Sequence, residues 1–386
     1  MPKFIGRFFF GLAALTGVNA LAIAPDIPAV DTAPFVAREV DPKVHLLSTP
    51  QDWYGPAIGN VSIVEQTDGF VVVDSGLTAG NGRTIVRYIR ARSTKPVKAV
   101  VITHWHNDHP QGVSAIREAW PDSRIIATEE TKKGMLGPAL GEMVGLEPAE
   151  RFSTRVREMN AEQQAELDKL IADPSTAPDR RDRARKAKAD FAMFADTYAG
   201  THMVPPNETF ERKLVIGDPE VPVEMLFLGR ANTAGDAVVW LPKQKIVMSG
   251  DMVVAPSPFG FFSHPGEWVR TLGEPKALGY ATLIPGHGEP QTDTAYVDQL
   301  IGSIEDIRVQ VGPLAKQGLS LEEVGKRVDF ARYAAIFGKT DRMKTLFKVY
   351  WTDPMTENAW KEARGLPIVQ GEGEVTVAEQ SEKKRN

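Results

Sequence analysis

Three histidines and an aspartate stand close together in a chain that has only seven histidines. Residues 103–109 read Thr-His-Trp-His-Asn-Asp-His, which places His104, His106, Asp108 and His109 within six residues. Imidazole and carboxylate groups are ligands of zinc, iron and manganese. Because titratable groups crowded together repel one another and lose hydration, a cation would offset their cost. The run predicts a metal site, with His104 and His106 turned toward one ion and Asp108 and His109 toward a second.

Apolar segments that read as β-strands precede this run and three further candidate ligands. Residues 97–102 form the expected strand that ends at the histidine run. In the same way Asp74 follows residues 70–73, Asp251 follows residues 246–250, and His287 follows residues 280–286. Because an α/β sandwich gathers strand ends at one edge of its sheets, we expect these side chains to meet.

The order of expected elements indicates an α/β domain with a helical insertion. Strands over 61–64, 70–73, 97–102 and 125–128 alternate with helices over 83–92 and 111–120. Residues 129–200 are polar and helix-rich, and the helical pattern is clearest over 161–170 and 180–198. We expect this insertion either to cap the histidine run at 103–109, called the metal loop from here on, or to mediate a homodimer. Strands return over 210–216, 223–228, 237–241, 246–249 and 280–284, and helices follow over 296–316, 321–328 and 343–352.

Composition excludes several classes of function. The 386 residues are 42% hydrophobic and 25% charged, an ordinary globular composition, and the net charge of −5 argues against nucleic acid as a partner. Cysteine is absent, so neither a disulfide framework nor a thiolate nucleophile or ligand is available. We expect a small-molecule substrate.

The first 22 residues are typical of a signal peptide. Lys3 and Arg7 precede an apolar stretch over 8–21, and Ala20-Leu21-Ala22 offers a cleavage site between small residues. The stretch is short for a membrane anchor, and no later segment is apolar enough to span a bilayer. These features predict a periplasmic or secreted protein without a membrane span after cleavage.

Five ordered blocks together resemble the metallo-β-lactamase-fold metallohydrolase superfamily. The blocks are residues 71–76, 104–109, 229–236, 249–251 and 284–288. The resemblance implies an αββα sandwich, two β-sheets packed face to face with helices outside, over residues 44–300. We expect this domain to contain the helical insertion at about 129–200. A helical region over 301–370 would pack on the sandwich, and a charged tail would follow over 371–386.

The same resemblance implies a role for each candidate ligand. His104 and His106 look like ligands of a first metal, and Asp108, His109 and His287 look like ligands of a second. Asp251 looks like the carboxylate that bridges both metals, and Asp74 like the residue that orients the metal loop. The implied cofactor is one or two Zn²⁺ ions, with iron or manganese as alternatives.

One position departs from the family pattern. Where the family supplies a third histidine for the first metal, this chain has Asn232, whose neutral amide oxygen is a weaker zinc ligand than imidazole. Three readings stay open: Asn232 coordinates weakly in a binuclear site, one metal is held by the second site alone, or catalysis is lost. A distant histidine, His202 or His264, is a further candidate ligand.

Two features of the sequence bear on the substrate class, the absence of cysteine and a group of aromatic residues. Because it has no cysteine ligand, the chain resembles the glyoxalase II and lactonase-like branch of the superfamily. It does not resemble the zinc β-lactamases that have a cysteine in the second metal site. Five aromatic residues are candidates for an apolar wall at the site: Phe259, Phe261, Phe262, Trp53 and Tyr54.

The resulting expectation is an exported metal-dependent hydrolase. A metal-bound hydroxide would attack an ester, lactone, thioester or β-lactam, and Asp108 would receive the proton of the nucleophile. Two alternatives are a mononuclear iron oxygenase on the same fold and a non-catalytic binding protein with a degenerate metal site. Asn232 supports the last alternative, and the intact Asp108, Asp251 and His287 count against it.

Overall fold

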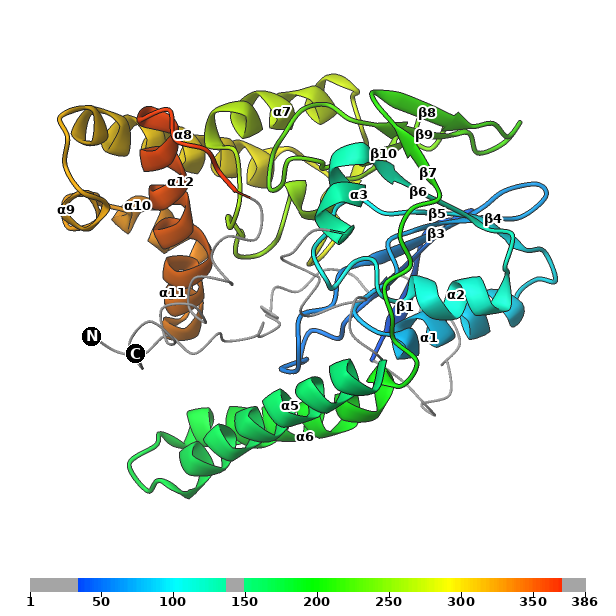
Figure 1. Ribbon diagram of the computed structural model, residues 1–386, viewed down its shortest axis with the longest axis horizontal. Coiled ribbons are helices and arrows are strands. Elements are labelled where there is room, and N and C mark those ends of the chain that lie inside the picture. The colour runs from blue at the N-terminus through cyan, green and yellow to red at the C-terminus, as the bar shows by residue number, and fades with distance from the viewer. Residues whose placement is uncertain (1–33, 137–148, 370–386) are drawn as a thin grey trace.

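Two β-sheets form the centre of the computed structural model, which describes residues 34–136 and 149–369 (Figure 1). The first sheet has its three antiparallel pairs at the start and its three parallel pairs at the end. Its strands are β1 (Val36–Asp41), β2 (Val44–Ser48), β3 (Val61–Glu65), β4 (Phe70–Val73), β5 (Val97–Val101), β6 (Arg124–Thr128) and β7 (Glu208–Phe210), neighbours in that order.

The second sheet is smaller and mostly antiparallel. Its strands in spatial order are β12 (Thr282–Ile284), β11 (Ile246–Met248), β10 (Val238–Leu241), β9 (Val223–Leu226) and β8 (Lys213–Ile216). Only β11 and β12 run parallel, so both of these strands end at the same edge. That shared edge is where the sequence changes from apolar residues to Asp251 and His287.

Three hydrophobic clusters establish a four-layer αββα sandwich. Side chains of both sheets, such as Val71, Val101, Met225 and Val239, fill the central layer. The other face of the first sheet packs on α1 (Ala79–Arg90) and α2 (Val113–Ala119). The second sheet packs on α7 (Pro265–Ala277) and α8 (Ala295–Lys316). The fold class predicted from the sequence is confirmed.

A C-terminal helical region extends the outer layer of the second sheet. It comprises α9 (Leu321–Gly325), α10 (Ala331–Phe337), α11 (Asp341–Phe347), a π-helical turn (Lys348–Thr352) and α12 (Asp353–Ala363). Buried side chains of these helices, among them Phe337, Trp351 and Met355, share one apolar cluster with α7 and α8. The region is therefore part of the core of the second sheet.

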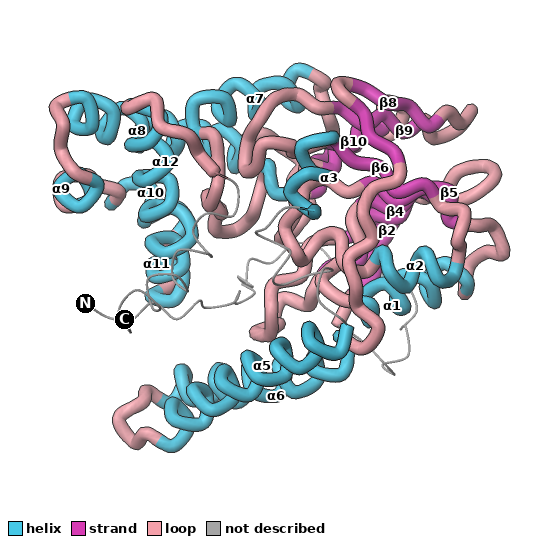
Figure 2. Tube along the Cα trace, in the orientation of Figure 1, coloured by secondary structure: helices cyan, strands magenta, loops and turns pink. Residues whose placement is uncertain are grey.

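The helical insertion is a hairpin that projects from the sandwich. Helix α3 (Glu129–Leu136) stays beside the first sheet, whereas α5 (Ala149–Ala172) and α6 (Pro178–Ala195) lie against each other and point away from it (Figures 1 and 2). Leu167, Ala184 and Phe191 form their apolar seam. The short turn Asp196–Tyr198, which follows α6 at the base of the hairpin, meets α1.

The buried carboxylate of Asp190 fastens this base to the loop between β2 and β3. Asp190 is 3% exposed, and its Oδ2 accepts a hydrogen bond of 2.8 Å from the backbone N–H of Tyr54. Its Oδ1 accepts one of 2.6 Å from Lys186 on the preceding turn of α6. Trp53 and Phe194 pack together beside this contact. The hairpin thus holds the β2–β3 loop, whose Gly59 N–H donates to Asp108 O of the metal loop at 3.0 Å.

One expected strand proved to be wrong. Residues 210–216 do not form a single strand: Phe210 ends β7 in the first sheet, and Lys213 begins β8 in the second. Glu211 and Arg212 between them are exposed, and burying two such charges without partners would be costly. The chain therefore changes sheets at the point where its charged residues must reach solvent.

Some expectations concern segments outside the described residues. The signal peptide over 1–22 and the charged tail over 371–386 both lie there. Within the described part of the chain, every helix is too short or too polar to cross a bilayer.

The Asp190 contact yields a test of how the hairpin acts on the loop. Replacing Asp190 with alanine removes a buried charged acceptor, a loss of about 1–3 kcal/mol. We expect hydrogen exchange of the backbone amides over 53–58 to accelerate, while the melting temperature changes by only a few degrees. Asp182→Ala, which removes an exposed acid from the same helix, is the control. Equal exchange in the two variants would contradict this role of Asp190.

Candidate metal centre

The predicted ligands meet where the strands of both sheets end. The metal loop follows β5, and Asp74 follows its parallel neighbour β4. From the second sheet, Asp251 lies in the short turn Gly250–Met252 after β11, and His287 lies in the loop after β12. Sequence-distant side chains are brought together because parallel strands present their carboxyl ends at one edge.

The first cluster joins His104, His106 and Asp251. His104 Nε2 lies 3.5 Å from Asp251 Oδ2, and His106 Nδ1 lies 3.9 Å from the same oxygen. The two imidazole nitrogens are 2.9 Å apart. Two ligands of one tetrahedral zinc ion, each about 2.1 Å from it, are about 3.4 Å apart. The three atoms have separations close to that value.

The second cluster joins Asp108, His109 and His287. His287 Nε2 lies 2.9 Å from Asp108 Oδ2, and His109 Nε2 lies 3.7 Å from that oxygen. Asp251 belongs to this cluster as well, because its Oδ1 is 3.3 Å from His109 Nε2 and 3.5 Å from His287 Nε2. Asp251 therefore directs one oxygen toward each cluster.

These donors fit a pair of divalent cations. His104 and His109 are fully buried, and Asp108 and Asp251 are 3% and 4% exposed. Asp251 Oδ1 and His109 Nε2 are buried atoms without a hydrogen-bond donor or acceptor partner among the described residues. Buried polar atoms are otherwise almost always paired, so atoms left in this way need an explanation. Imidazole nitrogens and carboxylate oxygens aimed at shared points supply one, since these are zinc-type ligands.

Electrostatics also favour a cation. Burial lowers the pKa of the His104 imidazole to about 4, with the charge of His109 acting in the same direction. Burial opposes the charged form of His109 too, but the carboxylates of Asp108 and Asp251 outweigh it and raise its pKa well above the usual value. Despite burial, His287 and His109 hold the pKa of Asp251 well below its usual range. The carboxylates are thus ionised and require positive charge beside them, which divalent ions would supply.

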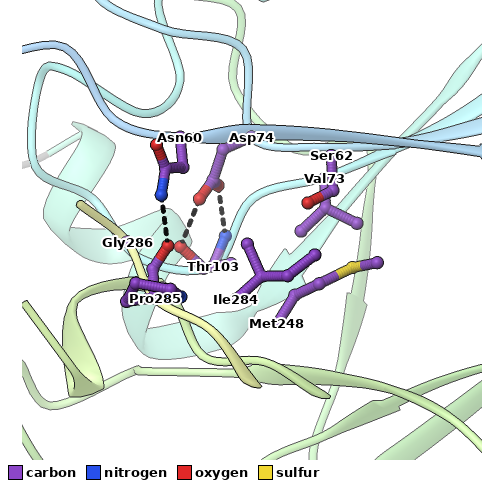
Figure 3. Close-up of a pocket in the computed structure, with 10 residues that line it drawn as sticks. Asn60, Ser62, Val73, Asp74, Thr103, Met248, Ile284, Pro285 and Gly286 are labelled. Atoms are coloured by element: carbon purple, nitrogen blue, oxygen red, sulfur yellow. Dashed lines mark hydrogen bonds between the residues drawn. The ribbon is translucent and has the colours of Figure 1, made fainter. Parts of the chain in front are cut away.

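Asp74 holds the metal loop in place beneath the ligands. Its Oδ1 accepts the backbone N–H of Thr103 at 2.9 Å, and its Oδ2 accepts the Thr103 hydroxyl at 2.7 Å (Figure 3). The same Oδ2 lies 2.8 Å from His109 Nδ1, which leaves His109 Nε2 free to face the second cluster. Asp74 has a φ of 59°, a left-handed conformation that is unusual for a residue other than glycine. Its carboxylate supports both the loop and one ligand.

The loop that carries His287 is fixed by Asn60 and by a close approach of backbones. Asn60 Nδ2 donates 2.9 Å hydrogen bonds to the carbonyls of Pro285 and Gly288 (Figure 3). A Cβ atom on Gly286 would lie 2.1 Å from Asp251 Oδ1, so only glycine fits there. Asn60 and Asp74 also line a cavity of about 10 Å³ between the sheets, the size of a single water molecule.

The loop that carries Asn232 contacts the metal loop. This loop follows β9 and returns to the metal loop where Ala237 N–H donates to Thr103 O at 2.8 Å. Asn232 is fully buried, and its Nδ2 donates a 2.7 Å hydrogen bond to the carbonyl of Phe259. His202 is exposed and bonds to the carbonyl of Gly200, and His264 precedes α7; neither belongs to the two clusters.

The five aromatic candidates fall into two separate groups. Phe259, Phe261 and Phe262 lie in one cluster, in which Phe259 has its ring centre 5.4 Å from that of His106. Trp53 is instead 2% exposed and packs in the core with Ile58, Leu77 and Phe194, and Tyr54 packs on the helical hairpin. Trp53 is therefore a core residue, because the hairpin covers the surface that the sequence alone left open.

Two aromatic residues near the centre were not among the predicted site residues. Tyr350, in the π-helical turn, stacks on Phe259 with ring centres 5.9 Å apart. Tyr198, at the base of the hairpin, has its pKa raised first by burial and then by the nearby carboxylate of Asp108. Both come from helical segments far along the chain, so no local motif marked them. In the sequence, aromatic residues recur at 191, 194 and 198 with helical spacing, a pattern that indicates packing of one helix face.

Comparisons with known proteins show similarity to two alkylsulfatases. Over 290 residues the chain is 23% identical to a linear primary-alkylsulfatase of a Pseudomonas species, which covers 71% of this chain and 50% of the relative. The solved structure of the stereoselective inverting sec-alkylsulfatase Pisa1, also from a Pseudomonas species, superposes with a TM-score of 0.57 at 16% identity, over 86% of this chain and 50% of that one. The chain spans about half the length of each of these relatives.

The match to a family extends over the whole metal centre. The model of the metallo-beta-lactamase superfamily covers residues 54–287, more than half of the chain and every strand from β3 to β12. Its limits enclose the metal loop, Asp251 and His287. The chain therefore belongs to the metallo-beta-lactamase superfamily.

Proposed function

We propose that this protein is a binuclear metal-dependent hydrolase whose preferred substrates are sulfate esters of apolar alcohols. The observation that carries the proposal is the position of Asp251, whose two oxygens face different groups of histidines at 3.3–3.9 Å. A carboxylate in that position can be shared by two cations. The proposal includes zinc as the metal and export directed by residues 1–22.

Each ligand has a defined task in this proposal. His104 and His106 would hold the first ion, Asp108, His109 and His287 would hold the second, and Asp251 would supply one oxygen to each. Bound divalent ions would polarise the substrate and lower the pKa of a bound water from about 15.7 toward roughly 7. Asp108 would accept the proton of the nucleophile, a role that the position of its Oδ2 in the second cluster supports.

The side chains around the ligands favour an apolar group on the substrate. Phe259, Phe261, Phe262 and Tyr350 are partly buried and form one aromatic cluster, and Phe262 also contacts Trp105 of the metal loop. Such a surface beside a charged centre suits a molecule with an anionic head and an apolar body. The names of the two alkylsulfatase relatives point in the same direction.

A substrate panel tests the proposed activity. We expect zinc-loaded protein to hydrolyse a medium-chain primary alkyl sulfate faster than an aryl ester, a lactone, a thioester or a chromogenic β-lactam. Removal of metal by a chelator should abolish turnover, and added zinc should restore it. A chain that binds zinc but turns over none of these compounds would contradict the hydrolase assignment and would favour a binding protein.

The ligands of the second cluster also fit one alternative function, that of a mononuclear iron oxygenase. Asp108, His109 and His287 present two imidazoles and one carboxylate, the ligand set of mononuclear iron oxygenases. Iron-loaded protein would then consume oxygen with a reduced sulfur compound and would show no hydrolysis in the panel. The hydrolase proposal predicts the opposite result.

Asp251 provides the sharpest test of the shared ligand. Asp251→Ala removes an oxygen from both clusters, so we expect loss of most of the bound metal at both sites and loss of activity. Elemental analysis of purified protein measures the bound metal, and Glu267→Ala, which removes a partly buried acid paired with Arg230, is the control. A variant that keeps two ions per chain would show that Asp251 does not bridge them.

Asp74 is expected to act on metal affinity without touching the metal. In Asp74→Asn an NH₂ group, which only donates, replaces one of the two carboxylate oxygens. The side chain then has a single acceptor atom for the hydrogen bonds that Thr103 and His109 now make to two oxygens. We expect zinc affinity to fall about 10- to 100-fold while the fold is kept. Chelator competition measures this, with the surface change Asp218→Asn as control. Unchanged affinity would mean that Asp74 only caps the turn after β4.

A further inference from the structure

The amide of Asn232 is fixed in one orientation. The carbonyl oxygen of Phe259 can only accept a hydrogen bond, so the group that faces it at 2.7 Å must be the NH₂ of Asn232. The amide oxygen, Oδ1, is therefore turned away from Phe259. It is buried, and none of the described residues gives it a hydrogen-bond donor. A buried oxygen left without a donor costs free energy unless something else binds it.

The neighbours of Asn232 contact the residues of the first cluster or the residue beside them. The aromatic ring of Phe259 lies against the imidazole of His106. The other end of the Asn232 loop is bonded to Thr103, the residue before His104. An oxygen is an acceptable ligand for a divalent cation, although it is weaker for zinc than imidazole. The orientation of the amide thus decides whether the first cluster gains a fourth ligand.

The C-terminal helical region holds the peptide that follows Phe259. Gly260 N–H donates to the carbonyl of Tyr350 at 2.8 Å, which fixes the loop to the π-helical turn. Asn358 of α12 donates from Nδ2 to Gly260 O at 2.9 Å and to Ser263 Oγ at 3.1 Å. Ser263 Oγ in turn donates to Gly260 O at 2.8 Å. Both backbone groups of Gly260 are therefore engaged, one of them directly by α12.

These hydrogen bonds leave the loop little freedom to move. Asn358 and Ser263 are 5% and 0% exposed, so water cannot readily replace the bonds between them. A Cβ atom on Gly260 would lie 2.6 Å from Met355 Cγ, which shows how closely α12 approaches the backbone there. The Phe259 carbonyl belongs to the peptide whose N–H, on Gly260, is bonded to Tyr350 O, and Asn358 holds the next peptide through Gly260 O.

We infer that the C-terminal helical region sets the zinc affinity of the first site, with Asn358 as the positioning residue and the Asn232 amide oxygen as the ligand. Asn358 holds Gly260, Gly260 fixes the Phe259 carbonyl, and that carbonyl turns the Asn232 oxygen toward the first cluster. The inference rests on the proposed binuclear centre. It resolves the departure at Asn232 in favour of a weak but oriented ligand.

The test is a zinc titration of the metal-free full chain in competition with a chromogenic chelator. We expect two binding steps, of which the weaker belongs to the first cluster. Asn358→Ala should weaken that step about tenfold and leave the tighter step unchanged. In an Asn232→Ala background the same change should have no effect on either step, because the ligand that it orients is gone.

Two further variants guard against a merely structural effect. Thr356→Val removes another buried hydrogen bond of α12, to the carbonyl of Thr352, and should leave both steps unchanged. Ser263→Ala is the milder way to loosen Gly260 if Asn358→Ala does not fold, and should weaken the same step. Equal weakening with and without Asn232, or no weakening, would overturn the inference. A wild-type chain that binds no zinc would instead refute the proposed metal centre itself.

Discussion

The carboxylate of Asp251 is the constraint on which the metal centre depends. It reaches the site from the second sheet, while His104, His106, Asp108 and His109 come from the first, so it joins ligands on both halves of the sandwich. Burying ionised carboxylates among imidazoles is unfavourable without positive charge beside them. Two cations shared by Asp251 would satisfy this requirement. The parallel pairs β4–β5 and β11–β12 place the ligands because each pair ends at the same edge.

Much of the centre could be predicted because its signals are local. Spacing within residues 104–109, and polar residues directly after apolar strands, are readable without knowledge of the fold. The four-layer architecture and the superfamily followed from blocks in a fixed order, and both are confirmed. The ligand roles and the domain limits remain predictions. Asn232 was recognised as a departure, but its orientation was not foreseeable, since it depends on a carbonyl 27 residues away.

What could not be predicted depends on contacts between distant segments. Trp53 reads as a candidate for the substrate wall, yet the hairpin buries it against Phe194. Tyr350 joins the aromatic cluster only because the C-terminal helices fold back over the second sheet. Helix α1 begins at Ala79 rather than at 83, because Thr78 and Asn81 form reciprocal capping bonds that an asparagine rarely signals. In each case the local residues are compatible with two structures, and tertiary packing selects one.

The most direct test of this account is elemental analysis of divalent metal per chain in purified protein reconstituted with zinc. Two ions per chain are predicted, because Asp251 presents one oxygen to each of two ligand clusters. One ion per chain, or none, would contradict the binuclear centre.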